Sequence, residues 1–233
     1  MIKNKNILFS LSIAFLIVEI QLSYLIQTKQ SEFNYSYFAI VLACAFCFLF
    51  AEKSKSYLFT QIALLCTVGA DYFLVFTNEK DQLAGMIFFC GTQIAYFLRI
   101  FFEEENPKAR KIHLITRVSV SVVVLAATCI VLGAKTDPLA LVSMFYYTNL
   151  ILNIIFAFIH FKSSYLLAIG LVCFVICDTF IGFANIGPYM SISESSIIYK
   201  LLNADFDIAW AFYVPSQALL SISLLNKEIK KRV

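Results

Sequence analysis

Two aspartates lie inside long apolar runs of the sequence, each at the start of the same short pattern. Asp71 opens the segment Asp-Tyr-Phe-Leu-Val-Phe and Asp178 opens Asp-Thr-Phe-Ile-Gly-Phe, so that both read Asp-x-Phe-x-x-Phe. A carboxylate inside a membrane-spanning helix costs several kcal/mol unless it is paired, hydrated or protonated. We interpret the pair as the functional centre, because two such costly residues in matching contexts require a reason.

Other polar side chains recur at helical spacing within apolar runs. They form two stripes: Tyr213, Gln217 and Ser221, and Tyr146, Asn149 and Asn153. Intramembrane polar groups face the interior of a bundle, so we expect both stripes to converge on the aspartates around a small hydrated cavity that opens to the outer side. The alternative is that they join helices by hydrogen bonds, an interpretation we favour for each of Asn149 and Asn153 taken singly.

The chain offers little for metal or nucleophilic catalysis. Its two histidines, His113 and His160, are predicted at the cytoplasmic membrane boundary, far from the aspartates, which disfavours a zinc hydrolase. Cys44-x-x-Cys47 has no second ligand pair nearby at suitable spacing. No Gly-x-Ser-x-Gly elbow or Gly-rich phosphate loop is present. We therefore expect no metal and no cofactor, and the two carboxyl groups remain.

The elements that position these residues are predicted to be membrane helices. Of the 233 residues, 61% are hydrophobic and 14% are charged, a balance typical of membrane proteins rather than soluble domains. Most apolar runs are near the ~20 residues that a bilayer requires. They cover residues 7–26, 37–51, 57–76, 82–102, 114–134, 139–160, 164–186 and 208–225. The sequence thus predicts an all-α polytopic membrane protein with eight transmembrane helices in one domain, residues 1–233.

Basic residues set the predicted orientation of these helices. Fourteen of the 18 Lys and Arg residues fall on the side of the two termini, and only Lys29, Lys80, Lys135 and Lys200 fall on the other. Because basic loops stay in the cytoplasm, we expect both termini to be cytoplasmic. No basic stripe interleaved with aromatic residues is present, so we exclude nucleic acid as a partner.

The repeated aspartate pattern also suggests an internal duplication. Asp71 and Asp178 lie four predicted helices apart, so both of their helices run from the inside to the outside. The helices that follow carry Thr92-Gln93 and Ser216-Gln217, a second correspondence. These matches predict two parallel four-helix repeats in which the aspartate helices face each other. The alternative is a chance match in a chain with 24 phenylalanines.

Three further charged features are assigned to roles outside the aspartate site. Glu19 lies midway along the first apolar run, where it could belong to a proton relay or pair with a polar residue of a neighbouring helix. We leave it out of the site because nothing repeats it elsewhere in the chain. Arg99 is interpreted as an anchor that reaches the cytoplasmic interface. The charged segment 103–111 is interpreted as a solvated loop.

Three segments resemble those of a known family, the YhhN-like lysoplasmalogenases. Residues 68–74 resemble its Gly-Asp-x-x-Leu segment, residues 174–178 its Phe-x-x-Ser-Asp, and residues 213–217 its Tyr-x-x-(small)-Gln. The resemblance covers most of the chain. This sequence departs from the usual pattern at three places: Ala70 separates Gly69 from Asp71, Cys177 stands where Ser is usual, and Gln93 stands where a His often precedes a Tyr.

The resemblance implies an eight-helix membrane hydrolase that cleaves the vinyl-ether bond of lysoplasmalogens to a fatty aldehyde and a glycerophospho-alcohol. Asp178 is expected to donate the proton and Asp71 to act as the base. The expected substrate-binding residues are Gln93, Tyr96, Tyr146, Asn149, Tyr213 and Gln217. The expected partners are a lysophospholipid substrate and membrane lipids, and the expected location is the inner membrane of a bacterium.

Two alternatives from other functional classes stay open. One is a proton-coupled transporter of small molecules or lipids, which would also place carboxyl groups in parallel repeats near the membrane midplane. Against it, Pro215 is the single candidate for a helix interruption of the transporter kind. The other alternative is a non-catalytic lipid-binding relative of the family.

Overall fold

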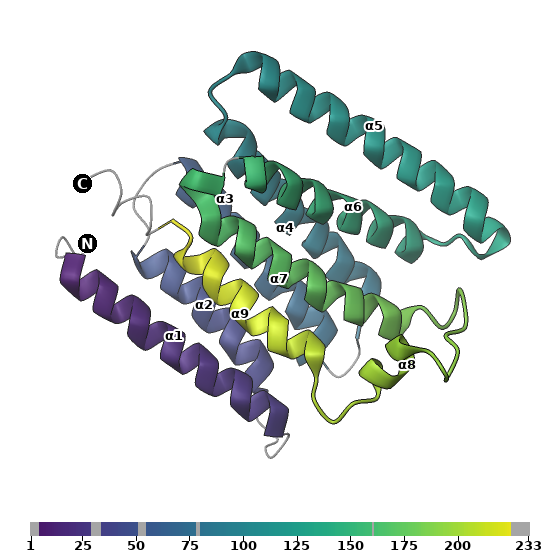
Figure 1. Ribbon diagram of the computed structural model, residues 1–233, viewed down its shortest axis with the longest axis horizontal. Helices are drawn as coiled ribbons and strands as arrows, with labels where there is room; N and C mark the ends of the chain where they lie inside the picture. The colour runs from purple at the N-terminus through teal and green to yellow at the C-terminus, as the bar shows by residue number, and fades with distance from the viewer. Residues whose placement is uncertain (1–4, 29–33, 51–54, 78–79, 160, 225–233) are drawn as a thin grey trace.

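The protein is a bundle of long helices that cross the molecule in roughly the same direction or its reverse (Figure 1). A computed structural model describes residues 5–28, 34–50, 55–77, 80–159 and 161–224, and these residues contain no strand. Six helices in this part of the chain are long and apolar enough to cross a membrane. The all-helical membrane architecture predicted from the sequence is therefore confirmed.

Each of the eight predicted runs folds as a helix. The long ones are α1 (Lys5–Thr28), α3 (Lys55–Asp71) with its extension η1 (Tyr72–Phe76), α4 (Gln82–Glu103), α5 (Pro107–Leu132), α6 (Pro138–Ile159) and α7 (Phe161–Asn185). The two shorter apolar ones are α2 (Tyr35–Phe50) and α9 (Ile208–Ile222). A 3-10 turn, η2 (Gly133–Lys135), and one short helix, α8 (Ile197–Leu202), complete the described elements.

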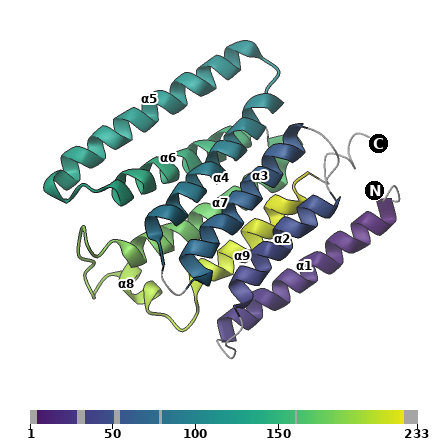
Figure 2. The ribbon, with the colours of Figure 1, turned by 180° about the vertical axis from the view of Figure 1, so that it is seen from behind.

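The helices form two layers, with one helix at each edge. Figures 1 and 2 show α2, α3 and α4 behind α9, α7 and α6 in one view and in front of them in the other. Helices α1 and α5 lie at opposite edges. The closest packing joins α3 to α4 and α7 to α9. A core of buried apolar side chains runs between the layers, including Leu150, Leu171, Phe174 and Leu220.

Glycines let the closest helix pairs approach each other. A Cβ atom added at Gly85 of α4 would come within 2.5 Å of Leu74 Cγ, and one added at Gly170 of α7 would come within 2.9 Å of Leu220 Cγ. Small residues at such contacts are the usual means by which membrane helices pack closely. These glycines therefore set the spacing of the helices that carry the aspartates.

The structure corrects the prediction of a solvated loop over residues 103–111. Helix α5 begins at Pro107, so Lys108, Arg110 and Lys111 lie on its first turns. The side chain of Asn106 caps the helix by accepting a hydrogen bond of 2.9 Å from the Lys108 backbone amide. Proline is favoured at a first helical position because its missing N–H would have no partner there. An apolar-run criterion missed this start because the first turns are basic.

Candidate functional site

Asp71 ends α3 and is buried, with 2% of its surface exposed. Its Oδ2 accepts a hydrogen bond of 2.7 Å from the hydroxyl of Tyr213, which is contributed by α9. The next residue begins the π-helix η1, which ends where the Thr77 amide donates to the Tyr72 carbonyl at 3.0 Å. Short π-helical segments often occur at functional sites, and no sequence pattern announced this one.

Asp178 lies on α7 and is also buried. Its Oδ2 accepts a hydrogen bond from the hydroxyl of Tyr146 on α6. Each aspartate therefore has one tyrosine partner. The sequence placed both tyrosines among the substrate-binding candidates, but did not anticipate that they would contact the carboxyl groups directly.

The two aspartate–tyrosine pairs meet at an aromatic cluster. The ring centroid of Phe174 lies 5.5 Å from that of Tyr213 and 6.5 Å from that of Tyr146. The ring of Phe89 lies 5.8 Å from Phe174 and 5.4 Å from Tyr146. Helix α3 packs chiefly against α4, and α7 packs chiefly against α9. The sequence predicted that the two aspartate helices face each other, but each packs chiefly against another helix. The two helices are connected through the two tyrosines and Phe174.

The two asparagines of the α6 stripe form hydrogen bonds with Arg117 and not with the aspartates. Arg117 of α5 donates hydrogen bonds to Asn149 Oδ1 at 2.6 Å and to Asn153 Oδ1 at 2.7 Å. Asn153 in turn donates to the Gln93 backbone carbonyl at 2.9 Å and to Gln93 Oε1 at 3.0 Å. Asn149 and Asn153 thus join helices, the interpretation favoured for each of them singly. Gln93 is tied to this network, and its Nε2 has no partner among the described residues.

Arg117 is a buried cation that the sequence did not single out. It is 7% exposed, and its guanidinium lies 4.4 Å from the centroid of the Phe97 ring. Its NH2 group also lies 3.3 Å from Nε2 of His113. No carboxylate in the described part of the chain forms an ion pair with it. His160, the other histidine, lies outside the described residues.

Other predicted site residues are buried without hydrogen-bond partners. Both polar atoms of the Gln217 amide and the hydroxyl of Tyr96 have no partner in the described structure. The two carboxyl oxygens of Glu19 also have no hydrogen-bond partner among the described residues, and this side chain is 3% exposed. Buried polar groups are normally satisfied, so these atoms are available to water or to a polar ligand.

Arg99 is not the interfacial anchor that the sequence predicted. It is fully buried and donates to Thr60 Oγ1 at 3.0 Å and to Ser223 Oγ at 2.6 Å. It also pairs with Glu103 Oε1 at 3.4 Å. Arg99 therefore joins α4 to α3 and to the end of α9. The hydroxyl groups of Thr60 and Ser223 accept its hydrogen bonds inside the bundle, so the guanidinium does not need to extend to water.

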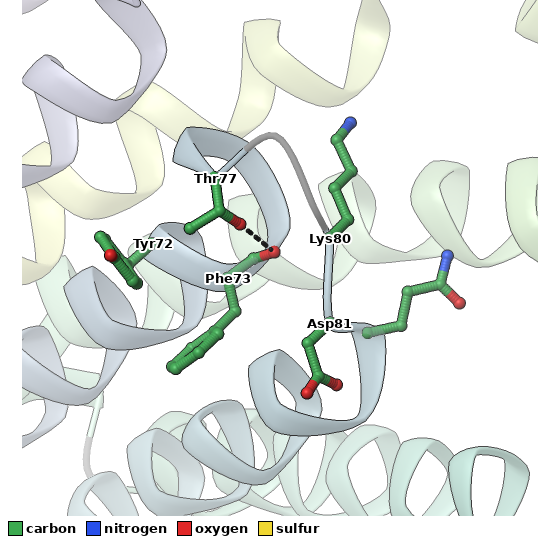
Figure 3. A pocket seen from close by; sticks show the side chains of 6 residues that line it. Tyr72, Phe73, Thr77, Lys80 and Asp81 are labelled. Carbon is green, nitrogen blue, oxygen red and sulfur yellow. Dashed lines mark hydrogen bonds between the residues drawn. The ribbon is translucent and has the colours of Figure 1, made fainter.

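A hollow lies on the surface at the junction of η1 and α4 (Figure 3). It is lined by Tyr72, Phe73, Thr77, Lys80, Asp81 and Gln82. Its first two residues directly follow Asp71 in the chain, but the aspartates themselves do not line it. In the described part of the chain, no three His, Cys, Asp or Glu side chains lie together as metal ligands would.

Comparison with known protein families gives a match to most of the chain. A sequence profile of the YhhN family matches residues 33–224, which cover most of the chain, and the chain therefore belongs to the YhhN family. No curated protein and no solved structure matches it significantly. The matched range includes both aspartates and both tyrosines and begins after α1.

Proposed function

We propose that this member of the YhhN family is a membrane-embedded hydrolase that cleaves the vinyl-ether bond of lysoplasmalogens. The observation that carries the proposal is the pair of buried aspartates, each held by a tyrosine hydroxyl, at positions inside the family match. Hydrolysis of an enol ether needs one group that delivers a proton and another that activates water. Two carboxyl groups can supply both, as they do in glycoside hydrolysis.

The proposed reaction proceeds in two stages. A carboxylic acid transfers its proton to the β-carbon of the vinyl ether, and the α-carbon becomes an oxocarbenium ion. Water, which loses a proton to the second carboxylate, then adds to this carbon. The second carboxyl group then returns its proton to the departing glycerol oxygen, and the hemiacetal hydroxyl gives its proton to the first carboxylate as the C–O bond breaks. The products are a fatty aldehyde and a glycerophospho-alcohol, one water molecule is consumed, and both carboxyl groups regain their starting states.

We assign proton donation to Asp178 and water activation to Asp71. Burial favours the neutral form of a carboxylic acid, which suits a buried aspartate to hold the proton that it donates. Tyr146 donates a hydrogen bond to one oxygen of the Asp178 carboxyl group, which holds that group in place. Tyr96, Gln93 and Gln217 would orient the glycerol and the water, because each retains a buried polar atom without a partner among the described residues.

The proposal includes a membrane arrangement of eight spans in two parallel four-helix repeats. It is supported by a matched pair of hydrogen bonds. Thr92 Oγ1 donates to the Ala63 carbonyl at 3.2 Å, and Ser216 Oγ donates to the Gly170 carbonyl at 2.9 Å. Each hydroxyl precedes a glutamine, and each acceptor lies the same number of residues before its aspartate. A duplicated unit would produce this equivalence.

The proposed location is the inner membrane of a bacterium, with both termini in the cytoplasm. The bias of basic residues toward one side supports this orientation. The start of α1 and the end of α9 lie at the same end of the bundle, as an even number of crossings requires (Figure 1).

The test is aldehyde release by the purified protein. A lysoplasmalogen is supplied in detergent or nanodiscs, and a lysolipid with a saturated ether at the same position serves as the control. We expect aldehyde from the vinyl ether alone, because the saturated ether has no carbon that can accept the proton. A transporter would carry lipid without releasing aldehyde. A non-catalytic relative would bind lipid and would also release no aldehyde.

A further inference from the structure

The hollow at the junction of η1 and α4 has no role in the reaction described so far. Aromatic, hydroxyl, amide and charged side chains meet there at the surface beside an aspartate helix (Figure 3). We propose that it binds the zwitterionic head group of a single-chain phospholipid, with the phosphate beside Lys80 and the amine beside Asp81. The proposal rests on the proposed function, because it treats the hollow as part of the same substrate's binding site.

The position of the hollow matches the length of such a lipid. From Asp71 to the end of η1 at Phe76 the chain rises at most ~8 Å at the helical rise per residue. The vinyl-ether oxygen and the phosphorus of an extended lysolipid are about 6 Å apart, since the glycerol carbons and one ester oxygen separate them. A lipid whose vinyl ether reaches the level of Asp71 therefore places its head group near the end of η1, beside the hollow.

The walls of the hollow are held in place by hydrogen bonds and ring contacts. Thr77 Oγ1 donates to the Phe73 carbonyl at 3.2 Å, as Figure 3 shows. The ring of Phe73 lies 5.7 Å from that of Phe88 on α4. The lining combines two aromatic rings with polar and charged side chains, and an amphipathic ligand can contact both kinds of group.

The charges at the hollow match a zwitterion better than an anion. Lys80 and Asp81 are adjacent and exposed, and their side chains extend in opposite directions (Figure 3). Among the described residues that line the hollow, Lys80 and Asp81 carry opposite charges, so a head group with both a phosphate and an amine finds a partner for each. A head group with a phosphate alone would meet the carboxylate of Asp81 as well as the amine of Lys80.

The experiment measures the binding of three saturated-ether lysolipids to the purified full-length protein. The ligands are 1-alkylglycerol, 1-alkylglycero-3-phosphate and 1-alkylglycero-3-phosphoethanolamine, and none of them can be cleaved. Lys80→Gln should raise the Kd of both phosphate-bearing ligands roughly two- to fivefold, the range that exposed ion pairs give, and leave 1-alkylglycerol unchanged. Asp81→Asn should weaken only the ethanolamine ligand.

Asp81→Asn is informative because asparagine keeps the structural role of the residue. Asp81 caps α4 by accepting a hydrogen bond of 2.9 Å from the Ala84 amide, and asparagine caps helices about as well as aspartate. Lys135→Gln is the matched control, since Lys135 bonds the Tyr189 carbonyl at 3.1 Å and does not line the hollow. It should change none of the three Kd values.

Several results would overturn the proposal. These are equal losses for 1-alkylglycerol and the phosphate ligands in Lys80→Gln, no loss in that variant, or an equal effect of Asp81→Asn on all three ligands. Displacement of the lysolipids by inorganic phosphate would also overturn it, because the hollow would then be a site for free phosphate. Since no ligand is cleavable, the binding pattern stands or fails independently of aldehyde release.

Discussion

Each aspartate carboxyl group accepts a hydrogen bond from one tyrosine, but the two tyrosines are placed differently relative to the halves of the bundle. Tyr213 belongs to α9 and binds Asp71 in the other half of the bundle, whereas Tyr146 belongs to α6 and binds Asp178 within its own half. The two carboxyl groups therefore have unequal surroundings, although their sequence patterns match. Unequal surroundings are what an acid and a base need, because the two must hold different protonation states during the reaction.

The first prediction concerns the aspartates themselves. Asp71→Asn and Asp178→Asn keep the size of the side chain and remove its proton chemistry. Each should lower the rate of aldehyde release at least ~10²-fold, the loss typical of removing a general acid or base, while binding of the saturated-ether lysolipid changes less. Wild-type aldehyde release by both variants, at equal expression and folding, would end the two-carboxylate mechanism.

The second prediction concerns the tyrosines. Tyr213→Phe removes the hydrogen bond to Asp71, and Tyr146→Phe removes the one to Asp178, while both keep the aromatic contacts with Phe174. We expect a smaller loss of turnover than in the aspartate variants, because water can replace part of a lost hydroxyl. Rates measured side by side decide this. A loss equal to that of Asp→Asn would give the tyrosine a direct part in the chemistry.

At the scale of elements, the glycines at helix contacts give the third prediction. Gly170→Val should lower the unfolding temperature of the purified protein in detergent, because its Cβ would come within 3.3 Å of the Leu220 backbone nitrogen, which cannot move as a side chain can. Gly182→Val is the control on the same helix, where an added Cβ meets nothing within 4 Å. Equal unfolding temperatures for the two variants would show that α7 and α9 do not pack as described.

The hydrogen bonds of Arg117 give the fourth prediction, also at the scale of elements. Arg117→Leu would leave the oxygens of Asn149 and Asn153 buried without this donor, and an unsatisfied buried group costs about 1–3 kcal/mol. We expect a lower unfolding temperature than in the wild type. Lys108→Gln, at an exposed position on the same helix, serves as the control. An unchanged unfolding temperature in Arg117→Leu would show that these hydrogen bonds do not stabilise the packing of α5 against α6.

The sequence predicted the helices better than it predicted their ends and polar contacts. Hydrophobic runs found every long helix, because a lipid environment demands long apolar segments. They missed the start of α5 at Pro107 and the change to π-helix after Asp71, since both depend on local backbone hydrogen bonds. Arg99 was misplaced because its nearness to a helix end suggested access to water, whereas Thr60 and Ser223, distant in sequence, satisfy it inside.

At the scale of the whole molecule, the orientation in the membrane decides which leaflet can deliver a substrate. The segment between α7 and α9 holds α8 and several exposed apolar side chains, among them Met190, Ile197 and Phe206. It lies at the same end of the bundle as the junction of η1 and α4, as the hydrogen bond between Gln82 and Asn185 indicates. If this end faces the outside, a lipid reaches the hollow from the outer leaflet.

The last prediction tests this orientation with single cysteines in a variant that lacks the seven native ones. Ser195→Cys lies at an exposed position of the segment between α7 and α9, and Lys108→Cys lies at an exposed position on the first turn of α5. Because the basic residues favour a cytoplasmic start for α5, a membrane-impermeant thiol reagent should label Ser195→Cys in intact cells. It should label Lys108→Cys only after the membrane is broken. The reverse pattern would place the junction of η1 and α4 in the cytoplasm, and the substrate would then have to come from the inner leaflet.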